Sequence, residues 1–108
     1  MNGLWSLVLE FNGRRSGAAI VIKDGRILGG DSGMIYVGEI ATGENDSFSG
    51  KITATQFLDH KDGFFPGAKE FEVAISGKHK EDKLVGLAAV SLAPGHQIAL
   101  TGSRKVEA

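Results

Sequence analysis

The chain has 108 residues, of which 42% are hydrophobic and 23% charged, so it suits one compact domain over residues 1–108 and is not a disordered tail. The 12 Lys and Arg against 13 Asp and Glu give a net charge of −1, which argues against a general nucleic-acid binder. The absence of cysteine excludes disulfides and thiolate metal sites, and no apolar run approaches the ~20 residues that span a bilayer.

The N-terminal quarter predicts three strands. The first segment has no basic region and reaches Glu10 before any cleavage site, so we interpret it as a strand rather than a signal peptide and expect a cytoplasmic protein. Asn12-Gly13 and Asp24-Gly25 predict tight hairpin turns, because these residues tolerate positive φ. The remaining two strands are expected over residues 17–23 and 26–30.

Further strands are expected along the rest of the chain, at residues 34–40, 48–55, 70–76, 84–92 and 97–103. A polar loop over 41–46, a long connection over 59–68 with turns at Asp62-Gly63 and Pro66-Gly67, and a charged turn over 78–83 separate them. The segment 84–92 also fits a helix, but Gly86 and the β-branched Val85 and Val90 favour a strand.

About eight strands, spaced about 8–12 residues apart with hairpin-length connections, predict an all-β fold. We expect a single up-and-down antiparallel β-barrel. Glycines on the inward face of several strands are expected to mark the bends that a small barrel needs: Gly38, Gly50, Gly77, Gly86 and Gly102.

No residue pattern supports catalysis, a metal or a cofactor. Residues 30–33, Gly-Asp-Ser-Gly, resemble the nucleophile loop of chymotrypsin-like proteases, but no histidine precedes them, so a tight turn is the better interpretation. His60, His79 and His96 have no metal-ligand spacing, and no glycine loop opens a helix to cradle phosphate. We therefore expect a non-enzymatic protein.

The first, second and seventh expected strands are apolar on both faces, although a barrel buries only one face of each strand. The outer faces predict a homodimer interface formed by Leu4, Val8, Ala19, Val21, Val85 and Leu87.

Four aromatic residues have two interpretations. Either they fill the barrel or they line a pocket for a small apolar ligand: Trp5, Tyr36, Phe48 and Phe71. The basic pairs at Arg14-Arg15 and Lys78–Lys80 predict solvated turns more than an RNA-binding surface, which needs exposed aromatic residues on a basic face.

Several segments resemble one family. The segments 2–5 (Asn-Gly-Leu-Trp), 17–21, 24–31 (which includes Gly-Gly-Asp) and 36–38 (Tyr-Val-Gly), with Phe-Pro-Gly at 65–67, resemble the GrlR-type negative regulators of bacterial type III secretion. The resemblance implies a lipocalin-like β-barrel that is dimeric, has no enzyme activity and binds a transcriptional activator.

The family's known member needs an acidic run, Glu-Asp-Glu-Asp, which this chain lacks. The nearest candidates for contact with a protein partner are Glu44 and Asp46, followed by Glu81 and Asp82. Glu44 and Asp46 rank first because their loop contains no Lys or Arg, whereas Lys80 and Lys83 flank the second pair. Regulation through a protein partner and binding of a small apolar ligand are thus the two functions that the sequence suggests.

Overall fold

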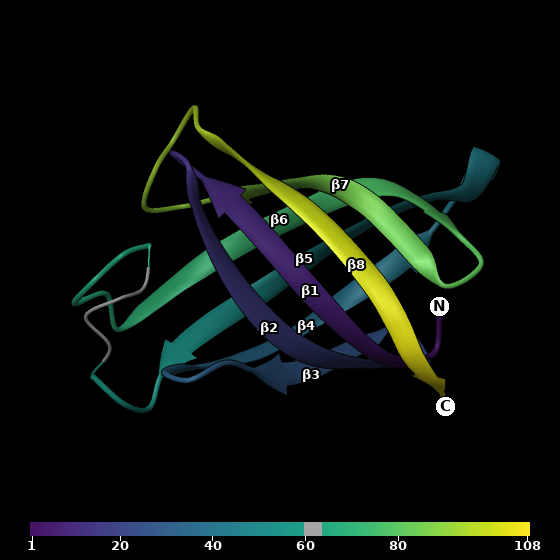
Figure 1. Cartoon of the computed structure of the whole chain (residues 1–108), viewed down its shortest axis with the longest axis horizontal. Helices are drawn as coiled ribbons and strands as arrows, with labels where there is room; N and C mark the ends of the chain where they lie inside the picture. The colour runs from purple at the N-terminus through teal and green to yellow at the C-terminus, as the bar shows by residue number, and fades with distance from the viewer. Residues whose placement is uncertain (60–63) are drawn as a thin grey trace.

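The computed structural model describes residues 1–59 and 64–108, and shows a closed barrel in which each strand pairs with the next along the chain and β1 pairs with β8 (Figure 1). All eight pairings are antiparallel. The predicted up-and-down barrel is confirmed. The strands are β1 Gly3–Phe11, β2 Arg14–Lys23, β3 Arg26–Gly30, β4 Met34–Thr42, β5 Ser47–Gln56, β6 Glu70–Lys80, β7 Lys83–Val90 and β8 Gln97–Glu107.

The only helical element among the described residues is the 3-10 turn η1, Glu44–Asp46, between β4 and β5. No helix in this part of the chain is long and apolar enough to cross a membrane. The segment predicted as either strand or helix forms β7, with Leu84, Ala88 and Val90 buried and Val85 and Leu87 exposed. His60 and the predicted Asp62-Gly63 turn lie outside the described residues.

The two predicted hairpin turns have the expected geometry. Asn12 and Gly13 have φ of 51° and 75°, and Asp24 and Gly25 have φ of 50° and 80°. Two successive positive φ angles are the mark of a type I′ turn, whose twist matches that of the flanking strands. Asn-Gly and Asp-Gly therefore fix where β1 turns into β2 and where β2 turns into β3.

Several strands are longer than predicted at their polar ends. β2 begins at Arg14 rather than at residue 17, and β8 continues to Glu107 rather than ending at residue 103. β6 extends to Lys80, so the charged turn is only Glu81 and Asp82. Ladder hydrogen bonds join backbone groups, and polar side chains on the solvent side do not stop them.

Inward glycines let neighbouring strands approach closely. A Cβ atom on Gly77 would lie 2.1 Å from the carbonyl oxygen of Val85, and one on Gly86 would lie 2.1 Å from that of Ser76. Gly77 and Gly86 face each other in the β6–β7 ladder. Because backbone occupies the space of their side chains, the two strands can pair this closely only with glycine at both positions.

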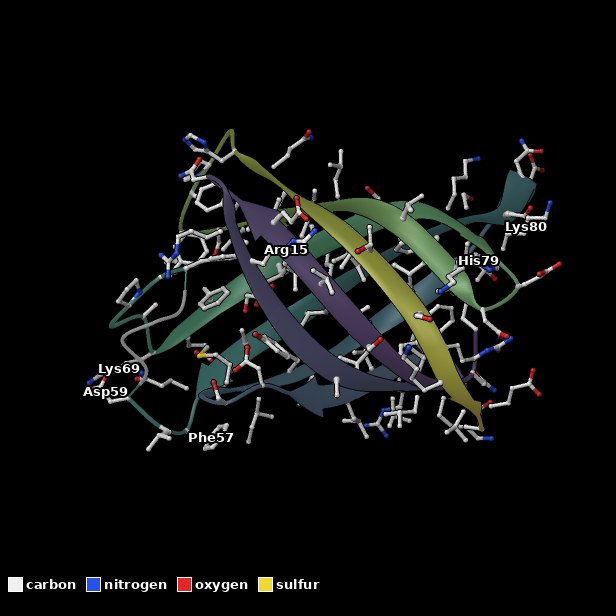
Figure 2. All side chains as sticks on the ribbon, viewed as in Figure 1. Arg15, Phe57, Asp59, Lys69, His79 and Lys80 are labelled. Carbon is white, nitrogen blue, oxygen red and sulfur yellow. The ribbon has the colours of Figure 1, made fainter. Side chains whose placement is uncertain are left out.

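The barrel has two ends with different hairpins. The β2–β3, β4–β5 and β6–β7 turns lie at one end with both chain termini, and the β5–β6 connection lies at the other (Figure 1). Phe57, Asp59 and Lys69 mark the second end in Figure 2, and Lys80 marks the first. We call the interior next to the first end the closed half. Large apolar side chains fill it: Trp5, Ile22, Ile27, Ile40, Phe48 and Leu84.

Arg104 stabilises the pairing of β1 with β8 near the chain termini. Its guanidinium lies 5.7 Å from the ring centre of Trp5, makes a 2.8 Å ion pair with Asp82, and donates to the backbone carbonyl of Asn2 at 3.1 Å. The register of β1 against β8 shifts between Leu4 and Trp5. The Arg104 side chain is only 17% exposed, so these contacts are partly shielded from water.

Candidate functional site

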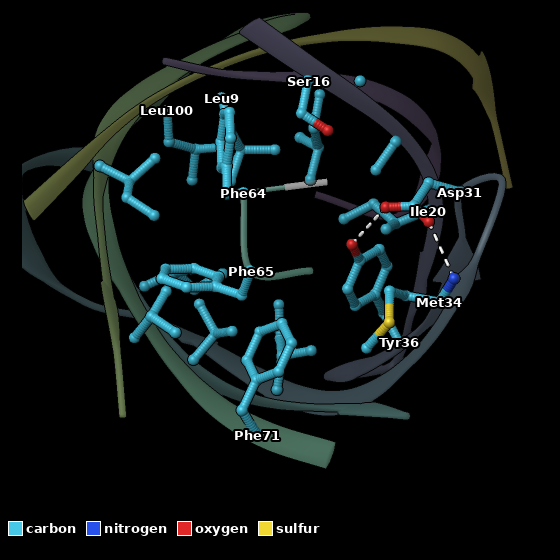
Figure 3. A pocket seen from close by; sticks show the side chains of 18 of the residues that line it. Leu9, Ser16, Ile20, Asp31, Met34, Tyr36, Phe64, Phe65, Phe71 and Leu100 are labelled. Carbon is cyan, nitrogen blue, oxygen red and sulfur yellow. Dashed lines mark hydrogen bonds between the residues drawn. The ribbon is translucent and has the colours of Figure 1, made fainter. Parts of the chain in front are cut away.

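The second half of the barrel interior contains a cavity of about 310 Å³ (Figure 3). Its wall comes from β1, β2, β4, β5, β6, β7 and β8 and from the β3–β4 and β5–β6 connections. Most lining side chains are apolar, and they include Leu7, Leu9, Ile20, Ile52, Phe64, Phe65, Phe71, Val73, Ile98 and Leu100. Small side chains, Ala18 and Ala68, also line this half.

Aromatic side chains cover this end of the barrel. The Phe11 ring lies 5.8 Å from the Phe64 ring and 6.0 Å from the Phe65 ring, and Phe65 packs edge-on against Phe71 at 5.7 Å. His96 packs edge-on against the other side of this group, with its ring 6.0 Å from Phe11. These centroid distances are typical of favourable aromatic pairs, so the connection after β5 is tied to the end of β1.

One polar cluster faces the apolar cavity. The Tyr36 hydroxyl donates a 2.5 Å hydrogen bond to Oδ2 of Asp31, and Oδ1 of Asp31 accepts from the backbone N–H groups of Gly33 and Met34, both at 2.9 Å (Figure 3). Asp31 and Tyr36 both line the cavity. The Gly-Asp-Ser-Gly segment is thus the tight turn that we predicted, and its aspartate also presents an oxygen to the cavity.

The environment keeps the Tyr36 hydroxyl protonated. Burial raises the pKa of this group well above its ordinary value, and the hydrogen bond to Asp31 and the negative charge of that carboxylate raise it further. Tyr36 therefore acts as a fixed donor to Asp31. Its single hydroxyl hydrogen is engaged, so towards the cavity the hydroxyl offers only its lone pairs.

A second ion pair stands at the mouth of the cavity. Arg15 lines the cavity, and its Nε lies 2.8 Å from Oε1 of Glu10 on the neighbouring strand. The Arg15 side chain is 76% exposed. The guanidinium of Arg14 lies 5.9 Å from the centre of the Phe64 ring, at the same end of the barrel. Arg15 thus already has a carboxylate partner, which is not Asp31.

The four predicted pocket aromatics divide between the two halves of the barrel. Tyr36 and Phe71 line the cavity. Trp5 and Phe48 do not line it, because both belong to the filled closed half. The sequence analysis did not identify Asp31, Phe64 or Phe65 as residues of a pocket. The signal for Phe64 and Phe65 was an aromatic pair inside a long polar connection.

The residues predicted at a dimer interface all lie on the outer surface of the barrel. Leu4 and Val21 face each other in the β1–β2 ladder, and Val8 and Ala19 lie beside them on the same two strands. Val85 and Leu87 lie on β7, on the far side of β8.

Leu4 and Val21 belong to a longer row that the sequence analysis did not recognise. Val106, Leu4, Val21, Leu28 and Val37 are successive ladder partners across β8, β1, β2, β3 and β4. All five are between 39% and 58% exposed. We call these five side chains the outer row.

The acidic residues predicted to contact a protein partner lie at the closed end. Glu44 and Asp46 are exposed on η1, where Lys78 donates to the backbone carbonyl of Asn45 at 2.9 Å. Asp82 is the partner of Arg104, so its charge is balanced by β8 rather than only by the neighbouring lysines. Their contact with a protein partner stays a prediction.

Other candidate sites have weaker support. Within residues 1–59 and 64–108, no three His, Asp or Glu side chains gather in a way that could hold a metal ion. An open hollow of about 580 Å³ lies over the outer faces of β4 to β7, where small side chains such as Ala41, Ser49, Ala74 and Ala89 lie between larger ones. Glu39 and Lys51 are cross-strand partners in its lining, but no hydrogen bond or ion pair joins its side chains among the described residues.

Comparison of the sequence with protein-family models and with curated proteins finds no match. The likeness to GrlR-type regulators therefore stands on the segments quoted above, and the functional argument stands on the geometry of the cavity.

Proposed function

We propose that this barrel binds a small, mainly apolar molecule in the cavity that lies opposite the closed half. The observation that carries the proposal is the combination of apolar walls with one polar cluster, Asp31 and Tyr36, in a cavity of about 310 Å³. Small-molecule sites are usually apolar cavities of this size or larger, with a few polar groups that orient the ligand. An eight-stranded barrel has room for side chains or for one small ligand.

The walls give such a ligand an ordered environment. Strands contribute most of the lining, and the aromatic contacts between Phe11, Phe64, Phe65 and Phe71 hold the end of the barrel over it. A ligand that fills the cavity buries apolar surface of its own and of the cavity wall, and this burial stabilises the complex by about 25 cal/mol per Å². Because strands form most of the wall, little conformational entropy is lost on binding.

A substitution that fills the cavity tests this proposal. Ala18 lines the cavity and Ala19, the next residue, is exposed on the outer face. We expect Ala18→Phe to weaken binding of 4-phenylbutanol about tenfold or more, because its ring takes the space of the ligand. Ala19→Phe is the matched control and should leave the affinity unchanged. Isothermal titration calorimetry measures both, and equal binding by the two variants would place the ligand outside the cavity.

We further propose that the outer row joins two copies of the chain. The row crosses five strands, about 19 Å at the usual strand spacing, and five exposed apolar side chains in register are more than a monomer commonly leaves in water. Arg26 and Glu39 are cross-strand neighbours beside the row, so a two-fold arrangement can set each opposite its counterpart of opposite charge. The net charge of −1 opposes self-association little.

The oligomeric state tests this second proposal. We expect a dimer at micromolar concentration, and we expect Leu28→Glu to weaken the association by about tenfold or more, because a carboxylate must then be buried at the interface. Leu92→Glu is the control, since Leu92 is exposed to a similar degree but lies in the connection between β7 and β8. Analytical ultracentrifugation distinguishes the variants. A monomeric wild-type protein, or equal effects of both substitutions, contradicts the proposal.

A further inference from the structure

The polar cluster of the cavity indicates what kind of polar group the ligand carries. Both carboxylate oxygens of Asp31 accept hydrogen bonds, two from backbone N–H groups and one from Tyr36. A group that accepts three hydrogen bonds and donates none has the role of an ionised carboxylate. The hydrogen of Tyr36 is directed at Asp31, so both residues present lone pairs to the cavity.

The negative charge of Asp31 has no ion-pair partner among the described residues. Arg15 also lines the cavity, but its Nε lies 2.8 Å from Oε1 of Glu10, so it already has a carboxylate partner. Ser16 and Gln56, which also line the cavity, carry side chains that can either donate or accept. The cavity therefore contains one carboxylate whose charge the described part of the chain does not balance.

We infer that the ligand is an amine: a protonated primary amine on an apolar, preferably aromatic, body. An ammonium group carries three donors, enough to reach Asp31 Oδ2 and the Tyr36 oxygen together, and it supplies the missing positive charge. Phe65 and Phe71 lie in the same cavity, where aromatic rings favour both an aromatic body and a nearby cation. An alcohol would fit with weaker hydrogen bonds, and a carboxylate would be repelled.

This inference rests on the proposed ligand-binding function, and three matched probes separate the two. 4-Phenylbutylamine, 4-phenylbutanol and 4-phenylbutyrate share one apolar body and differ in the head group. We expect the amine to bind about tenfold tighter than the alcohol, and the alcohol to bind tighter than the carboxylate, by calorimetry at neutral pH. If none of the three binds, the proposed function itself is wrong. If the amine binds no tighter than the alcohol, the function stands and the inference is wrong.

Substitutions test whether Asp31 and Tyr36 cause the preference for the amine over the alcohol. Asp31→Asn should reduce the preference for the amine over the alcohol to about twofold or less, while binding of the alcohol stays close to that of the wild type, because shape is kept and charge is lost. Tyr36→Phe should reduce the preference partly. Glu44→Gln removes one negative charge at the opposite end of the barrel and should leave the preference unchanged.

Two outcomes overturn the role of Asp31. One is an Asp31→Asn protein that keeps the full preference for the amine, and the other is a Glu44→Gln protein that loses it. Thermal unfolding of each variant checks that the barrel is folded. If Asp31→Asn does not fold, the three probes on the wild-type protein and on Tyr36→Phe still decide, because a wild-type protein that does not prefer the amine contradicts the inference.

Discussion

Replacing Trp5 by alanine is expected to lower the free energy of unfolding by about 3–5 kcal/mol. Trp5 is 1% exposed and is among the largest fully buried side chains. Its indole N–H donates to the backbone carbonyl of Met1 at 2.8 Å, and the Arg104 guanidinium lies 5.7 Å from its ring centre. The substitution leaves a void in the closed half and removes the surface against which Arg104 packs.

Ile35→Ala provides the control for this prediction. Ile35 lies on β4 outside the outer row and is 46% exposed, so its loss should cost less than about 1 kcal/mol. Urea unfolding followed by far-ultraviolet circular dichroism suits both variants, because Trp5 is the only tryptophan and its fluorescence is lost with it. Similar losses for the two variants would mean that the closed half is not the main core.

Gly77→Ala is expected to destabilise the barrel by about 2–3 kcal/mol although it adds only one methyl group. That methyl group would lie 2.1 Å from the Val85 carbonyl oxygen and 2.6 Å from the Cα atom of Gly86. Both neighbours are backbone atoms, which cannot turn aside as a flexible side chain can. The β6–β7 ladder must therefore separate locally.

Gly17→Ala distinguishes this clash from a general effect of glycine in strands. Gly17 lies on β2, and the nearest atom to an added Cβ is the Leu7 carbonyl oxygen at 3.8 Å. Because alanine restricts the unfolded chain more than glycine does, we expect this change to be neutral or to stabilise the protein by about 0.5–1 kcal/mol. Thermal unfolding compares the pair directly, and equal changes in the melting temperature for the two variants contradict the expected clash at Gly77.

The architecture was predictable from the sequence because its signals are local. Asn12-Gly13 and Asp24-Gly25 determine two turns through their own backbone preferences, and alternation along β1 determines which side faces inward. The polar ends of β2 and β8 were missed because their pairing depends on the neighbouring strands. The side chains at these ends are mostly polar and do not indicate that the backbone there pairs with β1.

The candidate site was predictable only in part, because depth along the barrel axis depends on register. Tyr36 and Trp5 both point inward, but Trp5 pairs with Arg104 near the chain termini, in the filled half, whereas Tyr36 pairs with Gly29 near the opposite turn. The sequence predicted Asp31 to be a turn residue, and its Oδ1 does accept the turn's backbone N–H groups. The hydrogen bond at its Oδ2 could not be predicted, because it depends on where the fold places Tyr36, five residues later and across the turn.

The seam between β1 and β8 has a consequence for solubility. Hairpin turns or loops connect the other seven strand pairs along the chain, while this pairing joins residues about a hundred positions apart in sequence. If it opened, the ring would become a curled sheet with two edge strands, each offering unpaired N–H and C=O groups to any passing chain. Arg104 contacts Asn2, Trp5 and Asp82 at one end of that seam, so we expect its loss to favour aggregation through exposed edges.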